Sequence, residues 1–413
     1  MQYASSAVLA PAHDDDTGRG RRSGPPPRKG RAGKAGRKRR DPLWAKLLVI
    51  LGALLMLASG TTIIGQKLIF AAATSSFNQT DLLDPAQPKQ HVSINGAKNI
   101  LLVGVDSRPD QNPNDWVRSD SIMVLHVPAT HDRAFLVSIP RDTFVDIPAY
   151  NNGKKSNRAV KDKINSAFAM GGDGLAGLDG RKKGFQLLQQ TISLNYHLDF
   201  QAGAIVDFQG FQQVVQVLGG VDMRVDEEVK SIHIGTNNKT GKFQTPYRID
   251  SNTVPHPVPG VTPKTYHVGN QHLAAWEALD YVRQRDILAN NDGDYGRTRH
   301  QQQFIKAVFK GILSANVLSD PGKLKNVLAV VGKAMTVDSG GIALDDWIFA
   351  MRNISANSIL TVKTNGGQFN SRNVPGLGSV EEMTPTSLEL MDSIRRDAVD
   401  TFIQSHTDWV SQS

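Results

Sequence analysis

The sequence predicts a mixed α/β fold in which helices cover both faces of a central mixed sheet, preceded by one N-terminal transmembrane helix. Short apolar runs rich in Val, Ile and Leu alternate with stretches of helical periodicity over residues 98–413. This alternation is typical of sheets whose two faces are both buried. Residues 47–65 contain no charged side chain, and about 20 apolar residues cross a bilayer as a helix.

The basic charge of the chain lies in its N-terminal tail. The net charge is +8 over 413 residues, and residues 1–46 contain 12 Lys and Arg against 4 Asp and Glu, so the remainder is balanced. The tail is rich in Gly, Pro and Arg and is predicted to be disordered. The positive-inside rule places it in the cytoplasm and the rest of the chain outside the cell membrane. The basic excess therefore indicates topology and not nucleic-acid binding.

These features divide the chain into four predicted parts. They are a disordered basic cytoplasmic tail, a transmembrane anchor, an extracellular linker and one folded domain, at residues 1–42, 43–72, 73–97 and 98–413. Within the last part, the motifs lie in residues 98–312 and a helical C-terminal part follows in 313–413. A cleaved signal peptide is the alternative to the anchor, because "IFAAATSS" is similar to a cleavage site. The absence of cysteine excludes disulfides and thiolate chemistry.

The elements of the domain follow from residue periodicity and turn residues. Strands are predicted at residues 99–105, 121–127, 133–139, 203–208 and 220–225. Helices are predicted at residues 184–196, 210–219, 270–283, 294–316, 323–335 and 384–410. Two long polar or Pro-rich loops are predicted at residues 150–162 and 237–263.

Charged residues stand at the ends of the first three strands. Asp106 and Arg108 follow the first strand, Arg118 and Asp120 precede the second, and Arg141 follows the third. A short connection joins the first two strands, so the first four residues lie near one another. Arg141 joins them only if the strand order allows it. Taken alone, "DSRP" after the first strand also fits an ordinary turn.

A second group of charges lies at a predicted loop-to-helix junction in residues 280–303. It contains Arg283, Arg285, Asp294, Arg297 and Arg299. A helix N-terminus favours anions over cations, and a bound phosphate would reconcile arginines with that position. A solvated basic helix face is the alternative interpretation.

These residue types indicate a site for a phosphorylated anion and a metal ion. Arginine presents a planar fork that binds phosphate oxygens in pairs. The Asp106 and Asp120 carboxylates suit Mg²⁺, which binds one or two carboxylates together with substrate phosphates. We therefore predict a diphosphate substrate with Mg²⁺ as cofactor.

Seven motifs, in one order along residues 98–312, resemble the LytR-CpsA-Psr (LCP) family of bacterial cell-wall ligases. They are "NILLVGVDSR", "RSDSIMVLHV", "LVSIPRDT", "KINSAFAMGG", "VDFQGFQQVVQVLGGVDM", "ALDYVRQR" and "GDYGRTRHQQQ". The resemblance implies an α/β/α domain outside the membrane that acts as a Mg²⁺-dependent phosphotransferase. Its partners would be a polyprenyl-diphosphate-linked glycopolymer, from which the polymer is moved, and peptidoglycan, to which a phosphodiester link is formed.

The resemblance also implies roles for individual residues. Asp106 and Asp120 match the carboxylates associated with metal, and Asp106 and Arg141 match catalytic positions. The matches to diphosphate-binding arginines are Arg108, Arg118, Arg141, Arg283, Arg285 and Arg297, and the supporting residues are Lys163, Asn165 and Asp294. Many members carry arginine where this chain has His300. We include the adjacent Arg299 among the candidate diphosphate ligands, and the sequence leaves open whether Arg299 or His300 replaces the usual motif arginine.

Two other functions fit the same residues. The first is a polyprenyl-diphosphate phosphatase, which sends the same phosphorus to water. The second is a non-catalytic lipid-diphosphate binder that attenuates envelope processes. A transfer product with peptidoglycan separates the ligase from both.

Overall fold

The computed structural model describes residues 78–84, 94–105, 119–251, 254–312, 320–342, 346–347 and 350–411. The predicted tail and the span at residues 47–65 lie outside them, as do Asp106, Arg108 and Arg118. Within the described ranges, no helix combines the length and apolarity needed to cross a membrane.

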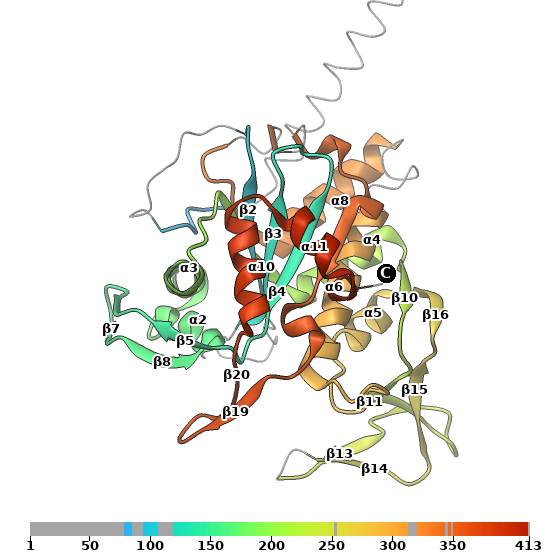
Figure 1. Ribbon diagram of the computed structural model, residues 1–413. Coiled ribbons are helices and arrows are strands. Elements are labelled where there is room, and N and C mark those ends of the chain that lie inside the picture. The colour runs from blue at the N-terminus through green and yellow to red at the C-terminus, as the bar shows by residue number, and fades with distance from the viewer. Residues whose placement is uncertain are drawn as a thin grey trace, which may run out of the picture. The chain divides into compact units, whose positions relative to one another are not determined.

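A seven-stranded mixed sheet forms the centre of the fold, in the order β1-β17-β9-β2-β3-β4-β18 (Figure 1). β3 runs antiparallel to both β2 and β4, whereas β2 pairs with β9, and β4 with β18, in parallel. This arrangement confirms the predicted mixed α/β class. The strands are β1 (Asn78–Gln79), β2 (Lys98–Val105), β3 (Ser119–Val127), β4 (Ala134–Ile139), β9 (Ala202–Asp207), β17 (Met335–Asp338) and β18 (Ile359–Val362).

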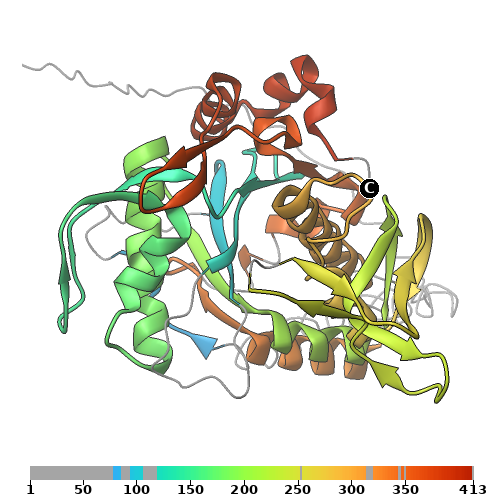
Figure 2. The ribbon, with the colours of Figure 1, turned by 90° about the horizontal axis from the view of Figure 1, so that it is seen from below.

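Helices pack on both faces of this sheet, as Figures 1 and 2 show. Successive side chains of a strand point to opposite faces. Val124 of β3 accordingly packs in one core with Phe168 and Phe185, whereas the next residue, Leu125, packs in another with Ile305. The first face is covered by α2 (Ile164–Gly172), α3 (Gly177–Tyr196), α10 (Pro385–Arg395) and α11 (Val399–Ser405), and the second by α6 (Gly293–Ile312).

A further apolar core includes Val206 of β9 and packs against Met335 of β17. Val214, Val225 and Phe304 are among its buried residues. The helices that build it with α6 are α4 (Phe208–Leu218), α5 (Ala275–Tyr281) and α8 (Pro321–Ala334). The strands that contribute to it are β10 (Val221–Val225), β11 (Val229–Asn237), β15 (Val261–Tyr266) and β16 (Gly269–Leu273). The short strands β12 (Phe243–Gln244), β13 (Tyr247–Ile249) and β14 (Pro255–Pro257) lie between β11 and β15 along the chain.

Several predicted loops and helices differ from the observed elements. The loop predicted at 237–263 contains short paired strands, and the helix predicted from residue 270 begins at Ala275, because Gly269–Leu273 pairs with β10. The long C-terminal helix is divided at Asp397, whose φ of 54° is left-handed. The loop predicted at 150–162 also contains paired strands, among β5 (Phe144–Ile147), β6 (Tyr150–Asn151), β7 (Ser156–Asn157) and β8 (Val160–Lys163).

The C-terminal part is not only helical. It supplies β17 and β18 to the central sheet and forms a hairpin of β19 (Ser371–Val374) and β20 (Gly378–Glu381). Short apolar runs such as Ile359–Val362 carry no clear period, which is why the sequence did not reveal them. The 3₁₀ turns of this part are η1 (Met351–Asn353), η2 (Ala356–Ser358), η3 (Thr364–Gly367) and η4 (Thr407–Trp409).

The predicted linker also belongs partly to the fold. Asn78–Gln79 pairs with β17. Leu82 is 0% exposed and belongs to the core that contains Val124, Phe168 and Phe185. We expect Leu82→Ala to lower the free energy of unfolding by about 2–5 kcal/mol, because it leaves a cavity in a packed core. Urea denaturation of the full-length protein in detergent measures this. Leu178→Ala, at a half-exposed leucine of α3, is the control and should change stability by about 0.5 kcal/mol or less. Equal effects would contradict a structural role for residues 78–84.

Candidate active site

The strand order brings Arg141 to Asp120. β3 is antiparallel to both neighbours, so the start of β3 and the end of β4 lie at the same edge of the sheet. The side chains meet there, with Arg141 Nη1 2.9 Å from Asp120 Oδ1. The condition that the sequence left open is therefore met. The end of β2, where Asp106 follows, lies at this edge too, although Asp106 itself is outside the described residues.

Carboxylates and cations alternate around Arg141. Its Nε atom lies 3.6 Å from Asp142 Oδ2 and 3.4 Å from Asp294 Oδ1. Asp294 Oδ1 is in turn 2.6 Å from Arg297 Nη2, and Asp142 Oδ1 is 3.0 Å from Lys163 Nζ. We call Asp120, Arg141, Asp142, Lys163, Asp294 and Arg297 the Arg141 cluster.

Two arginines of this cluster have nitrogen atoms that could still donate a hydrogen bond to a ligand. Arg141 Nε and Arg297 Nε are both buried and make no hydrogen bond to any described residue. A buried donor without an acceptor costs about 1–3 kcal/mol. An anion with several oxygens that bound beside Arg141 and Arg297 would satisfy these donors.

Electrostatics differ between the two arginines. Burial lowers the pKa of Arg141, but Asp294, Asp142 and Asp120 outweigh it and hold that pKa above the usual value. Burial also lowers the pKa of Arg297, and there Asp294 and Asp120 do not compensate, because the Arg141 and Arg285 charges add to the lowering. Of these two arginines, Arg297 therefore gains more from an added negative charge.

The "KIN" segment connects α2 to this cluster. Lys163 ends β8, and α2 begins at the next residue. The Ile164 amide donates to the Thr143 carbonyl, and the Asn165 amide donates to the Arg141 carbonyl at 3.1 Å. Asn165 thereby holds the backbone of Arg141, and Lys163 holds Asp142.

The remaining arginines occupy different positions. Arg283 and Arg285 follow α5, and Arg283 is half-buried, whereas Arg285 is exposed and pairs with Asp286 at 3.3 Å. The charge of Arg285 acts on Arg297, as described above. Arg299 does not join the Arg141 cluster, because its guanidinium contacts Asp226, Glu227 and Asp292.

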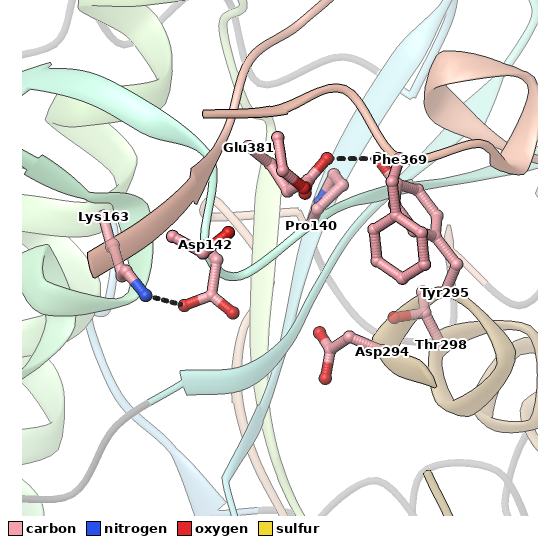
Figure 3. A pocket seen from close by; sticks show the side chains of 10 residues that line it. Pro140, Asp142, Lys163, Asp294, Tyr295, Thr298, Phe369 and Glu381 are labelled. Atoms are coloured by element: carbon pink, nitrogen blue, oxygen red, sulfur yellow. Dashed lines mark hydrogen bonds and ion pairs between the residues drawn. The ribbon is translucent and has the colours of Figure 1, made fainter. Parts of the chain in front are cut away.

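A cavity of about 230 Å³ adjoins the Arg141 cluster. Figure 3 shows Lys163 and Asp142 on one side of it and Asp294 on the other. Its lining residues are Pro140, Asp142, Lys163, Asp294, Tyr295, Thr298, Phe369, Ser371, Ser379 and Glu381. Sequence reasoning missed the lining residues from the C-terminal hairpin, which had no motif to mark them.

Glu381 fixes the hairpin against the cavity. Its backbone amide donates to the Asp142 carbonyl at 2.9 Å. Its buried carboxylate accepts hydrogen bonds from the Tyr295 hydroxyl, the Asn370 amide and the Ser371 hydroxyl. The C-terminal part therefore forms one wall of the site.

We expect Glu381→Ala to lower the free energy of unfolding by about 1–3 kcal/mol, because its donors lose their acceptor in a buried position. Urea denaturation of the full-length protein measures the loss. The matched control is Glu382→Ala. The Glu382 side chain is exposed, and its ion-pair partner in the described part of the chain is the exposed Arg372. Exposed pairs contribute about 0–1 kcal/mol. A loss at Glu382 as large as at Glu381 would contradict the assignment.

A mixed α/β domain that gathers arginines and carboxylates at one sheet edge is suited to bind phosphorylated substrates. The chain belongs to the LytR_cpsA_psr family, whose family model matches residues 67–382. This confirms the family that the motifs indicate.

Individual relatives agree with this assignment. The chain is 28% identical over 334 residues to a polyisoprenyl-teichoic acid–peptidoglycan teichoic acid transferase, TagU, of Oceanobacillus iheyensis, covering 78% of this chain and 86% of TagU. It is 26% identical over 319 residues to the cell wall biosynthesis protein LcpA of Corynebacterium glutamicum, covering 72% of this chain and 55% of LcpA.

The fold is shared with a solved structure, the protein gbs0355 of Streptococcus agalactiae. The TM-score is 0.51 at 19% identity, covering 73% of this chain and 88% of that chain.

Proposed function

We propose that this protein is a Mg²⁺-dependent phosphotransferase that moves a glycopolymer from a polyprenyl-diphosphate carrier to a sugar hydroxyl of peptidoglycan. Membership of the LytR_cpsA_psr family supports this proposal, as does the similarity to TagU. The observation that carries it is the pair of arginines, Arg141 and Arg297, which share Asp294 and each have a buried Nε atom that makes no hydrogen bond to a described residue.

A diphosphate fits the charges of this site. In the Arg141 cluster, each cation is already held by a carboxylate, so the guanidinium planes are fixed before the substrate arrives. Fixed donors are more effective than mobile ones, because they need no reorganisation as charge develops. Diphosphate oxygens would accept from Arg141 and Arg297, and we include Arg283 and Arg285 with Arg108 and Arg118 as further ligands.

The donor set at this edge fits Mg²⁺. Asp120 offers a half-exposed carboxylate of which one oxygen, Oδ1, is taken by Arg141. One or two carboxylates and substrate phosphates are enough for this ion, and Asp106 is the second candidate ligand. When bound, Mg²⁺ supplies positive charge that neutralises the phosphate oxygens.

The reaction that we propose is an in-line displacement. A peptidoglycan hydroxyl oxygen forms a bond to the phosphorus nearer the glycopolymer, and the bond from that phosphorus to the bridging oxygen breaks. Polyprenyl phosphate leaves with the electron pair, and Asp106 takes the hydroxyl proton. Arg141 and Arg297 hold the phosphoryl group in place and balance its charge. Positioning and charge stabilisation are the main protein contributions to phosphoryl transfer.

The proposal places the domain outside the cell membrane, with residues 47–65 as a single-pass anchor. The carrier lipid lies in the membrane, and peptidoglycan lies outside it. An anchored domain on the outer face would reach both substrates.

The test combines the full-length protein in detergent with Mg²⁺, a glycan on a lipid-diphosphate carrier and peptidoglycan fragments. Mass spectrometry should detect a phosphodiester adduct between glycan and fragment. Release of glycan phosphate without the acceptor would instead identify a phosphatase. Binding of carrier lipid without either product would identify a non-catalytic binder, and both results would overturn the transferase proposal.

A further inference from the structure

A second charged cluster lies apart from the Arg141 cluster and shares no residue with it. It consists of Asp226, Glu227, Asp292, Arg299 and His300, and we call it the Arg299 cluster. We propose that this cluster binds one divalent transition-metal ion through Asp226, Glu227 and His300.

The charge of the cluster calls for another cation. Three carboxylates surround one guanidinium, which leaves an excess of two negative charges when His300 is neutral. The Glu227 side chain is 2% exposed and that of His300 is 0% exposed. Buried charge without compensation is costly, so buried carboxylates are paired or bind metals.

Arg299 leaves some oxygen and nitrogen atoms of the cluster without a hydrogen bond in the described ranges of the chain. Its Nε atom is 2.6 Å from Asp226 Oδ2, and the other oxygen, Oδ1, is buried without a hydrogen-bond partner among the described residues. The His300 ring is fully buried, and its centroid lies 4.3 Å from that of the Tyr281 ring, with the two planes tilted by 31°. Neither ring nitrogen of His300 makes a hydrogen bond to the described part of the chain.

Candidate ligand atoms of the three residues have metal-ligand spacing, and one of them, Glu227 Oε1, also accepts a hydrogen bond from Arg299. His300 Nε2 lies 3.3 Å from Glu227 Oε1 and 3.7 Å from Asp226 Oδ1. One ligand atom from each of the three residues lies within 4.8 Å of the others. Two ligands bound at 2.0–2.2 Å in a tetrahedral site are about 3.4 Å apart. The three atoms are therefore placed to share one ion after small adjustments.

The ligand types indicate the class of ion. One imidazole nitrogen with carboxylate oxygens suits Zn²⁺ or Mn²⁺, whereas Mg²⁺ and Ca²⁺ prefer oxygen alone. Asp226 and Glu227 connect β10 to β11, and His300 lies on α6. A bound ion would join these segments and serve a structural purpose.

Zn²⁺ is the probe for the test. Full-length protein with a histidine-free purification tag is stripped with EDTA in detergent, loaded with Zn²⁺ and desalted, and its zinc content is measured. We expect about one Zn²⁺ per chain, falling below about 0.2 in His300→Gln and in Glu227→Gln. The matched control is His272→Gln, because the exposed His272 pairs with one carboxylate, Asp222, at 2.8 Å. This control should retain the full content.

A second measurement needs no variant. X-ray absorption of the zinc-loaded wild-type protein should show one imidazole and two or more oxygen ligands at about 2.0–2.2 Å. Failure to retain zinc, an all-oxygen shell, or equal zinc content in wild type and His300→Gln would each overturn the proposal. Asp120→Asn should keep the imidazole signal, which separates this ion from one bound at the proposed transferase site.

Discussion

Replacing Arg297 with methionine is expected to lower the rate of glycopolymer transfer about 10²–10³-fold, the loss typical of one fixed donor in an electrostatic site. Methionine keeps most of the buried volume but removes the charge and the donors. Arg297 is nearly buried, its Nε makes no hydrogen bond to a described residue, and its pKa is lowered by burial. These properties are expected of a group whose acceptor is the substrate. Product formation under saturating carrier lipid measures the effect.

Two results separate catalysis from folding in this experiment. The control is Arg396→Met on the exposed end of α10, whose guanidinium pairs with an exposed Asp392, and it should transfer at the wild-type rate. Arg297→Met should unfold at a urea concentration close to that of the wild type, because Asp294 keeps Arg141 as a partner. A folded Arg297 variant that retains half of the wild-type rate would remove Arg297 from the diphosphate site.

The edge of the central sheet was predictable because it depends on local signals. Apolar runs predicted β2, β3 and β4, and the charged residues at the ends of these runs included Asp120 and Arg141. What the sequence lacked was the order of the strands. The antiparallel pairing of β3 with both β2 and β4 depends on the tertiary structure. This pairing brings the end of β2, the start of β3 and the end of β4 together at one edge of the sheet.

The walls of the site were not predictable in the same way. Glu381 lies in a short polar hairpin, about 240 residues after Arg141 along the chain, and nothing in its neighbourhood carries an apolar period. Its structural role depends on hydrogen bonds to Asp142 and Tyr295, which form only in the folded protein. Leu82 was similarly hidden, because a single leucine in a polar stretch gives no pattern.

The choice between Arg299 and His300 needed the structure most. Both follow Arg297 on one helix, and residue type alone offers either as an anion ligand. Residues two positions apart on a helix point in very different directions. Arg299 accordingly contacts Asp226 and Glu227, whereas Arg297 contacts Asp294. We therefore expect Arg299 to stabilise the fold and do not include it among the proposed diphosphate ligands.

Arg299→Met should consequently lower the free energy of unfolding by about 3–5 kcal/mol, the usual cost of removing one partner from a buried charge pair. The variant leaves three carboxylates around an apolar side chain. Urea denaturation of the full-length protein at pH 7 in EDTA measures the loss without metal. Arg133→Met is the matched control, because Arg133 also contacts two carboxylates, Asp132 and Asp400, but its side chain is 42% exposed. It should lose about 0–1 kcal/mol.

The pH dependence gives the stricter test. In the wild type, the lowered pKa of Glu227 contributes stability that is present above its unfolded pKa of about 4.3 and is lost as the pH falls through the folded pKa. Without the Arg299 charge, which lowers the pKa of Glu227 in the wild type, the Glu227 carboxylate binds a proton more readily. The stability difference between wild type and variant should therefore be largest near pH 7 and shrink as the pH falls below about 5. A difference that is constant across this range would mean that Arg299 contributes through packing and not through its charge.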